Sequence, residues 1–175
     1  MAEQFEFELI FGLPEGGHDP FDLSDSVFEA GFEDAIVGTG NPRLLAVELE
    51  TEGDDAEAAM IAAAKAILRK LPQGSELREA RPDLVSQADV ADKLGVSKQS
   101  LQKREMPLPV MGGLYRIDEV EEFLVQMAKS AKRKPRFDMD SARKWFRAGR
   151  AARRLNARIA MKTLDVRSLE VLEPS

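Results

Sequence analysis

The sequence has no cysteine and only one histidine, His18, among its 175 residues. Without cysteine the chain has no disulfide, no thiol nucleophile and no thiolate metal ligand. A single histidine excludes a multi-histidine zinc site and a pair of histidines that share proton transfer. The remaining polar residues show no spacing that assembles a nucleophile with a base. We therefore predict no catalytic residues, no metal site and no cofactor, and a protein that is not an enzyme.

Long hydrophobic runs are also missing. No stretch of about 18 apolar residues occurs, so we expect no membrane-spanning helix. The first residues are acidic, whereas a signal peptide starts with basic residues. With 43% apolar and 32% charged residues, the composition is that of an ordinary globular protein. We predict a cytoplasmic protein with no membrane partner.

Charge is distributed very unevenly along the chain. Residues 1–80 hold 18 acids and 5 bases, a net charge of −13, whereas residues 129–167 hold 3 acids and 14 bases, a net charge of +11. Such asymmetry points to a polyanionic partner or to charge pairing inside the protein. We expect the acidic and basic parts to attract each other, within one chain or across a dimer.

The first 81 residues predict an acidic α+β domain. Apolar residues alternate with glutamates over 5–11 and 45–49, which is typical of half-buried strands. Helical spacing of apolar residues follows each of these strands, and Asp54 or Asp55 can cap the second helix. With short strands at 35–37 and 75–80, the order becomes strand, helix, strand, strand, helix, strand. This order predicts the ferredoxin-like βαββαβ arrangement.

The alternation places glutamates on the opposite face of this sheet, namely Glu6, Glu8, Glu48 and Glu50. We expect this face to be open and acidic. Two interpretations follow: a solvated sheet surface, as antiparallel sheets commonly have, or a docking surface for a basic protein partner.

Residues 82–128 predict a second domain of short helices. Ser86 and Asp89 have the spacing of a capping box, Gly95 can end the helix, and Ser97 repeats the cap for the next helix. Asp118 has the spacing to cap a third helix. Two short helices joined by a short glycine-containing turn are typical of a helix-turn-helix.

The second helix of this pair, from residue 98 to about 105, buries little beyond Leu101. Its other side chains, and the serine before it, are of the types that bind base edges and phosphates: Ser97, Lys98, Gln99, Ser100, Gln102, Lys103 and Arg104. After it, Gly112 and Gly113 can form a two-residue hairpin turn. The hairpin would be a wing that places Tyr115 and Arg116 near the sugar-phosphate backbone.

Two stretches in this region, VADKLGVSKQSL (90–101) and GGLYRIDEV (112–120), resemble the winged helix-turn-helix of MerR regulators and phage excisionases. The resemblance covers about 45 residues, and the link at 105–109 is short for the family. It implies a recognition helix in the major groove of double-stranded DNA, with a wing on the adjacent backbone. Residues 98, 99 and 102–104 would then read the groove.

Residues 129–175 predict a basic helical extension. A basic linker contains Lys132, Arg133, Lys134 and Arg136, and a helix with an apolar stripe follows from Asp140 through Ile159. Three interpretations stay open for this extension: an arm that contacts DNA, a dimerisation or docking helix, or a segment for a membrane surface or nuclear-type targeting.

Together these patterns predict a sequence-specific DNA-binding protein, a transcriptional regulator of bacterial or phage type. Because one small winged module reads few bases, we expect a homodimer on two half-sites. The alternatives are an antitoxin or adaptor whose N-terminal domain binds a protein partner, and an excisionase-like architectural DNA-binding protein.

Overall fold

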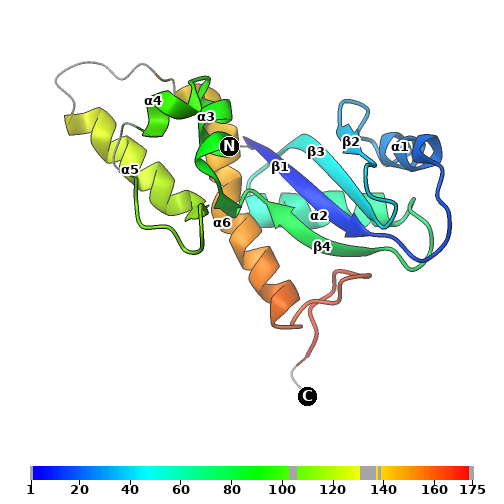
Figure 1. Ribbon diagram of the computed structural model, residues 1–175. Coiled ribbons are helices and arrows are strands. Elements are labelled where there is room, and N and C mark those ends of the chain that lie inside the picture. The colour runs from blue at the N-terminus through cyan, green and yellow to red at the C-terminus, as the bar shows by residue number, and fades with distance from the viewer. Residues whose placement is uncertain (1, 103–105, 131–136, 138, 174–175) are drawn as a thin grey trace.

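The computed structural model describes residues 2–102, 106–130, 137 and 139–173 and shows an α+β protein (Figure 1). These residues form a four-stranded antiparallel sheet, a two-stranded ladder and six helices. The buried side chains gather in two hydrophobic clusters, one on the sheet and one among the shorter helices. The α+β class expected from the sequence is confirmed. Nowhere in the described chain is there a helix with the length and apolar character needed to cross a membrane.

The larger sheet consists of β1 (Glu3–Gly12), β2 (Ile36–Gly38), β3 (Leu44–Gly53) and β4 (Glu76–Arg81). The strand order is β2-β3-β1-β4, and all neighbours are antiparallel. In the central pair, Phe7 lies opposite Leu49 and Leu9 lies opposite Val47. All four side chains are buried, as the period of two predicts.

Two helices cover the apolar face of this sheet, α1 (Pro20–Glu29) and α2 (Ala56–Leu68). Asp19 caps α1 by accepting a hydrogen bond from the Phe21 amide, and Asp55 caps α2 in the same way. The choice between Asp54 and Asp55 is thereby settled in favour of Asp55.

The second cluster is formed by a two-stranded ladder and three helices: β5 (Leu84–Val85), α3 (Gln87–Leu94), α4 (Lys98–Gln102), β6 (Tyr115–Arg116) and α5 (Ile117–Ser130). Its centre contains Val90, Leu101, Val120 and Leu124, each at most 1% exposed.

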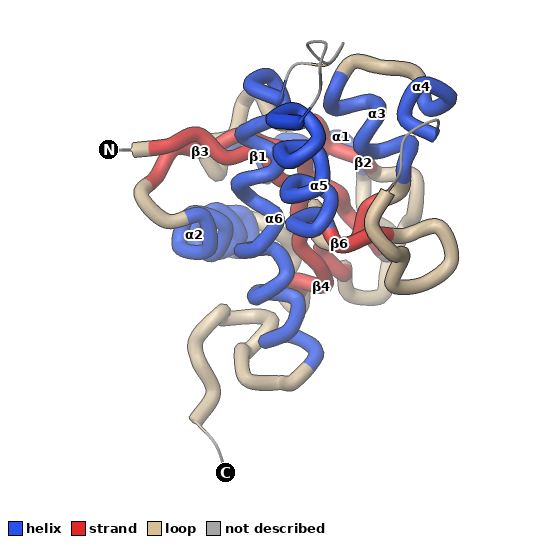
Figure 2. The backbone as a smooth tube through the Cα atoms, turned by 90° about the vertical axis from the view of Figure 1, so that its left-hand side faces the viewer, coloured by secondary structure: helices blue, strands red, loops and turns tan. Residues whose placement is uncertain are grey.

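The long helix α6 (Met139–Ala160) belongs to both clusters. Trp145 and Phe146 near its beginning pack with α3 and α5, while Ala148, Ala152 and Leu155 pack with the sheet and α2. Figure 2 shows α6 running between α2 and α5. The apolar stripe expected in this helix is therefore buried within the chain itself.

The structure corrects the expectation that the acidic sheet face is open. Lys93 of α3 forms ion pairs with Glu6 and Glu48, and Lys144 of α6 lies 2.8 Å from a carboxylate oxygen of Glu50. Basic side chains from two other elements therefore cover part of this face. Their positive charges offset the repulsion between the neighbouring carboxylates.

The start of α5 is also corrected. The helix begins at Ile117, two residues earlier than a cap at Asp118 would require. The Asp118 carboxylate instead forms a two-pronged hydrogen-bonded ion pair with the Arg153 guanidinium of α6. A partner 35 residues away in the sequence therefore replaces the local capping role.

Candidate nucleic-acid interface

The joint between α3 and α4 has the local chemistry that the sequence predicts. The Asp89 amide donates to the Ser86 hydroxyl at 3.1 Å, and the Ser86 amide donates to the Asp89 carboxylate at 2.9 Å, so the capping box is formed. Gly95 ends α3 in the left-handed conformation, with φ of 69°, which other residues rarely adopt. The chain therefore turns within three residues between the two helices.

Helix α4 is held by its cap and by one buried side chain. The Ser97 hydroxyl accepts a hydrogen bond from the Ser100 amide at 3.0 Å, and Leu101 is only 1% exposed. Ser97, Lys98 and Gln99 are exposed, and Ser100 is half-buried. The structure thus brings these four predicted site residues together on one short helix, with an ammonium group and an amide side chain toward solvent.

Several predicted site residues lie outside the part of the chain that the structure describes, namely Lys103, Arg104, Lys132, Arg133, Lys134 and Arg136. Gln102 is the last residue of α4. The expected continuation of the helix to about residue 105 also lies outside the described residues. That these residues bind DNA therefore stays a prediction.

The region expected to form a wing contains a tight turn with a different strand pairing. Met111 and Leu114 form a bridge around Gly112 and Gly113, and the Val110 amide donates to the Leu114 carbonyl at 2.8 Å. The following residues, β6, pair with β5 and not with the first arm of the hairpin.

This pairing affects the two residues expected to touch the DNA backbone. Tyr115 is half-buried and packs against the second cluster, while Arg116 is half-buried opposite Leu84. Tyr115 is therefore occupied in part by internal packing, and only part of the Arg116 side chain reaches solvent.

The basic residues of α6 form ion pairs within the chain. The pairs are Arg143 with Asp140, Lys144 with Glu50, Arg147 with Glu3, Arg150 with Glu122, Arg153 with Asp83 and Asp118, and both Arg154 and Arg158 with Glu57. The expected attraction between the acidic and basic parts of the chain is thus observed inside one molecule. Since exposed pairs are worth only about 0–1 kcal/mol each, this helix is held mainly by its apolar stripe.

Lys93 is the residue of this region that sequence reasoning missed. Its ammonium group hydrogen-bonds to Glu6, lies 3.4 Å from Glu48 and sits 5.9 Å from the centre of the Trp145 ring. Burial lowers the pKa of Lys93, but the hydrogen bond to Glu6 and the charges of Glu6 and Glu48 together outweigh it, so that the pKa lies above its ordinary value of 10.5. Lys93 therefore stays charged and connects α3, α6 and the sheet.

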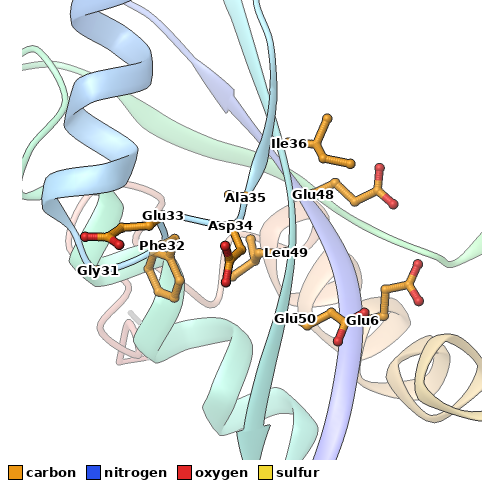
Figure 3. A pocket seen from close by; sticks show the side chains of 10 residues that line it. All are labelled: Glu6, Gly31, Phe32, Glu33, Asp34, Ala35, Ile36, Glu48, Leu49 and Glu50. Carbon is orange, nitrogen blue, oxygen red and sulfur yellow. The ribbon is translucent and has the colours of Figure 1, made fainter.

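The acidic sheet face is hollowed beside the loop between α1 and β2 (Figure 3). The hollow measures about 430 Å³, and five carboxylates line it: Glu6, Glu33, Asp34, Glu48 and Glu50. Glu33 and Asp34 make no ion pair with a described residue. The negative charges of Glu33 and Asp34 make this part of the surface repel phosphate groups.

Among the described residues, no group of three or more histidine, aspartate or glutamate side chains has the arrangement of a metal site. Comparisons with models of known protein families, with characterised proteins and with solved structures find no match to this chain.

Proposed function

We propose that the protein binds double-stranded DNA in a sequence-specific way, as a transcriptional regulator of bacterial or phage type, with α4 in the major groove. The observation that carries this proposal is the arrangement of α4. It is a short capped helix, fixed to the core by Leu101, with Lys98 and Gln99 exposed. Glutamine can pair with the edge of adenine, and lysine binds guanine or phosphate.

The proposal includes a finer description of the fold. We infer a ferredoxin-like domain over residues 1–81 and a winged helix-turn-helix over 82–128. The order β2-β3-β1-β4 and the α3–turn–α4 joint support these assignments. The pairing of β6 with β5 leaves the turn at 111–114 as a small wing.

Few basic side chains of the described residues are free to bind DNA phosphates. The basic side chains of α6 form ion pairs within the chain, and the first turn of α5 contains acidic residues, which repel phosphate. Phosphate attraction is therefore expected to come from Lys98, Arg116, the basic linker 132–136 and the predicted site residues Lys103 and Arg104. Since few phosphate contacts give modest affinity, two copies on two half-sites are expected to bind together.

The test is selection of bound sequences from a random duplex library at about 50 mM salt, followed by gel-shift titration. Gln99→Ala should change the preferred base at one position and weaken binding to the selected site by about tenfold. Lys70→Ala and Gln73→Ala, exposed residues on the sheet domain, are the matched controls and should bind normally. A folded protein that enriches no sequence would overturn the proposal.

The basic linker is tested separately by salt dependence. Replacing Lys132 or Arg133 with glutamine should lower affinity for all sequences alike and reduce the salt slope by about one each. The architectural alternative predicts a strongly bent DNA in the complex, which a gel-shift series with the site at different positions in the fragment measures.

A second candidate function is supported by the acidic hollow of Figure 3. The carboxylates of Glu33 and Asp34 lack ion pairs with described residues and can hold a basic protein partner, as in an antitoxin or adaptor. Glu33→Gln combined with Asp34→Asn should abolish such binding and leave DNA binding unchanged.

A further inference from the structure

Three arginines from distant parts of the sequence line one hollow at the far end of the sheet. They are Arg43 before β3, Arg78 in β4 and Arg167 after α6, around a space of about 370 Å³. One carboxylate, Glu76, shares this lining. The hollow in Figure 3, of comparable size, is lined by five carboxylates and by no base. A basic hollow therefore stands out on an acidic domain.

Backbone hydrogen bonds fix the three arginines near one another. The Leu13 amide donates to the Arg43 carbonyl at 2.9 Å, and the Arg43 Nε donates back to the Leu13 carbonyl at 3.0 Å. On the other side, the Leu77 amide donates to the Val166 carbonyl at 2.9 Å, which ties the residues before Arg78 and Arg167 together.

The side chains of Arg78 and Arg167 are available to a ligand. The Arg78 stem lies over Gly12, where an added Cβ would come within 3.2 Å of Cγ and Cδ of Arg78. Glu76 accepts a hydrogen bond from Nη1 of Arg78 at 3.1 Å and so orients its guanidinium. Arg167 is exposed and forms no ion pair with a residue that the structure describes, while Asp165 fixes its backbone by accepting the amide hydrogen bond.

We propose that this hollow binds a small molecule that carries a phosphate monoester. Three guanidinium groups, offset by Glu76 and by the Glu15 carboxylate 3.8 Å from Arg43, leave a net charge of about +1 that attracts a phosphate group, and the planar forks of arginine suit several phosphate oxygens at once. Leu13, Pro14 and Leu44 supply an apolar wall for the organic part of the molecule. The volume is at the small end of ligand pockets, which measure about 300–1,000 Å³.

The site is separate from the proposed DNA interface. Gly12 lies six residues beyond Glu6, which Lys93 of α3 contacts, and at about 3.3 Å per residue this separates them by roughly 20 Å. Figure 1 shows this end of β1 pointing away from α3 and α4. The ligand is therefore a free small molecule and not a phosphate of the DNA bound at α4.

The experiment titrates the full chain at low salt with inorganic phosphate and with phenyl phosphate, using acetate at equal ionic strength as the control anion. Amide NMR shifts should change saturably at residues 12–14, 43–44, 76–78 and 167, with phenyl phosphate binding more tightly than phosphate. Arg78→Gln and Arg167→Gln should each raise the Kd about tenfold. Gly12→Ala should also weaken binding, because it displaces the Arg78 stem.

Arg69→Gln, an exposed base at the end of α2, is the matched control and should leave the Kd unchanged. Circular dichroism confirms that each variant is folded. Equal effects of Arg69→Gln and Arg167→Gln, shifts centred elsewhere, or no saturable shift would each overturn the proposal. A 12-base-pair duplex that shifts the same amides in place of phenyl phosphate would also overturn it, since the hollow would then be part of a nucleic-acid surface.

Discussion

Gly149 of α6 lies directly against the side chain of Ile117 at the start of α5. A Cβ added at position 149 would come within 2.3 Å of Cγ2 of Ile117, and both residues are buried. Glycine inside a helix costs about 1 kcal/mol relative to alanine. Here it permits the close crossing of α5 and α6, which no other residue type allows without a shift of one of the helices.

Gly149→Ala should therefore lower the free energy of unfolding by about 1–2 kcal/mol. Overpacking costs about 1–3 kcal/mol, and the better helix propensity of alanine returns part of it. Urea denaturation measures the change. In an Ile117→Ala background the same substitution should be neutral or stabilising, because the clashing methyl group is gone. An equal loss in both backgrounds would contradict the close crossing.

Asn156 completes the outer edge of β4. Its Oδ1 accepts a hydrogen bond from the Ala80 amide at 2.8 Å, and its Nδ2 donates to the Ala80 carbonyl at 2.7 Å. Asn156→Leu keeps the volume but leaves both backbone groups unsatisfied, so it should cost about 2 kcal/mol. Gln126→Leu, which removes an exposed amide on α5, should change stability little. Similar unfolding midpoints for these two variants would disprove the role of Asn156.

Lys93→Met should destabilise the protein by about 1–2 kcal/mol, between the values of exposed and of buried ion pairs. The methionine keeps the apolar stem, while the Glu6 carboxylate, 17% exposed, loses its partner. Since the pKa of Lys93 is raised above 10.5, the stabilising charge is fully present below that pH and is lost only as the pH rises through the raised value.

The difference between wild type and Lys93→Met should consequently persist at pH 9, as measured by urea denaturation across a pH series. Lys98→Met, at an exposed position of α4, is the control and should have no effect on stability. A difference that disappears already between pH 7 and 9 would argue against the ion pair.

Glu121 should be a source of instability at neutral pH. Burial raises the pKa of the Glu121 carboxyl above 4.5. The charges of Asp118 and Glu122 raise this pKa further, whereas those of Arg150 and Arg143 lower it without cancelling the rise. The folded state therefore holds the proton more tightly, and stability falls as the pH rises through the raised pKa. Glu121→Gln should gain less than about 1 kcal/mol at pH 7 and nothing at pH 3. Glu122→Gln, which breaks the exposed pair with Arg150, should give no gain.

The features that depend on near neighbours in the sequence could be predicted. The alternation of Phe5, Phe7 and Leu9 located β1, and the spacing of Ser86 and Asp89 located the start of α3. These signals are local, because strand period and helix capping involve residues only two or three positions apart. For the same reason the expected order of strands and helices over the first 81 residues is observed.

The contacts between distant elements could not be predicted. The apolar stripe of α6 predicts that one side of the helix is buried. It does not predict whether a sheet, a second helix or another copy of the chain covers that side. Asp118 has the spacing of a cap, yet Arg153 binds it, and the sequence contains no sign of that pairing. The candidate site shows the same limit: α4 was predicted from its cap, whereas the half-burial of Tyr115 follows from a ladder between β5 and β6.

The sharing of α6 by both clusters has a consequence for synthesis of the chain. The strands leave the ribosome first, but their apolar core is closed only when Leu155 follows, about 75 residues after the end of β4. At a translation rate of roughly 5–20 residues per second, part of the apolar face of the sheet stays exposed for about 4–15 s. Folding of the sheet and its core is thus completed only after α6 has been translated.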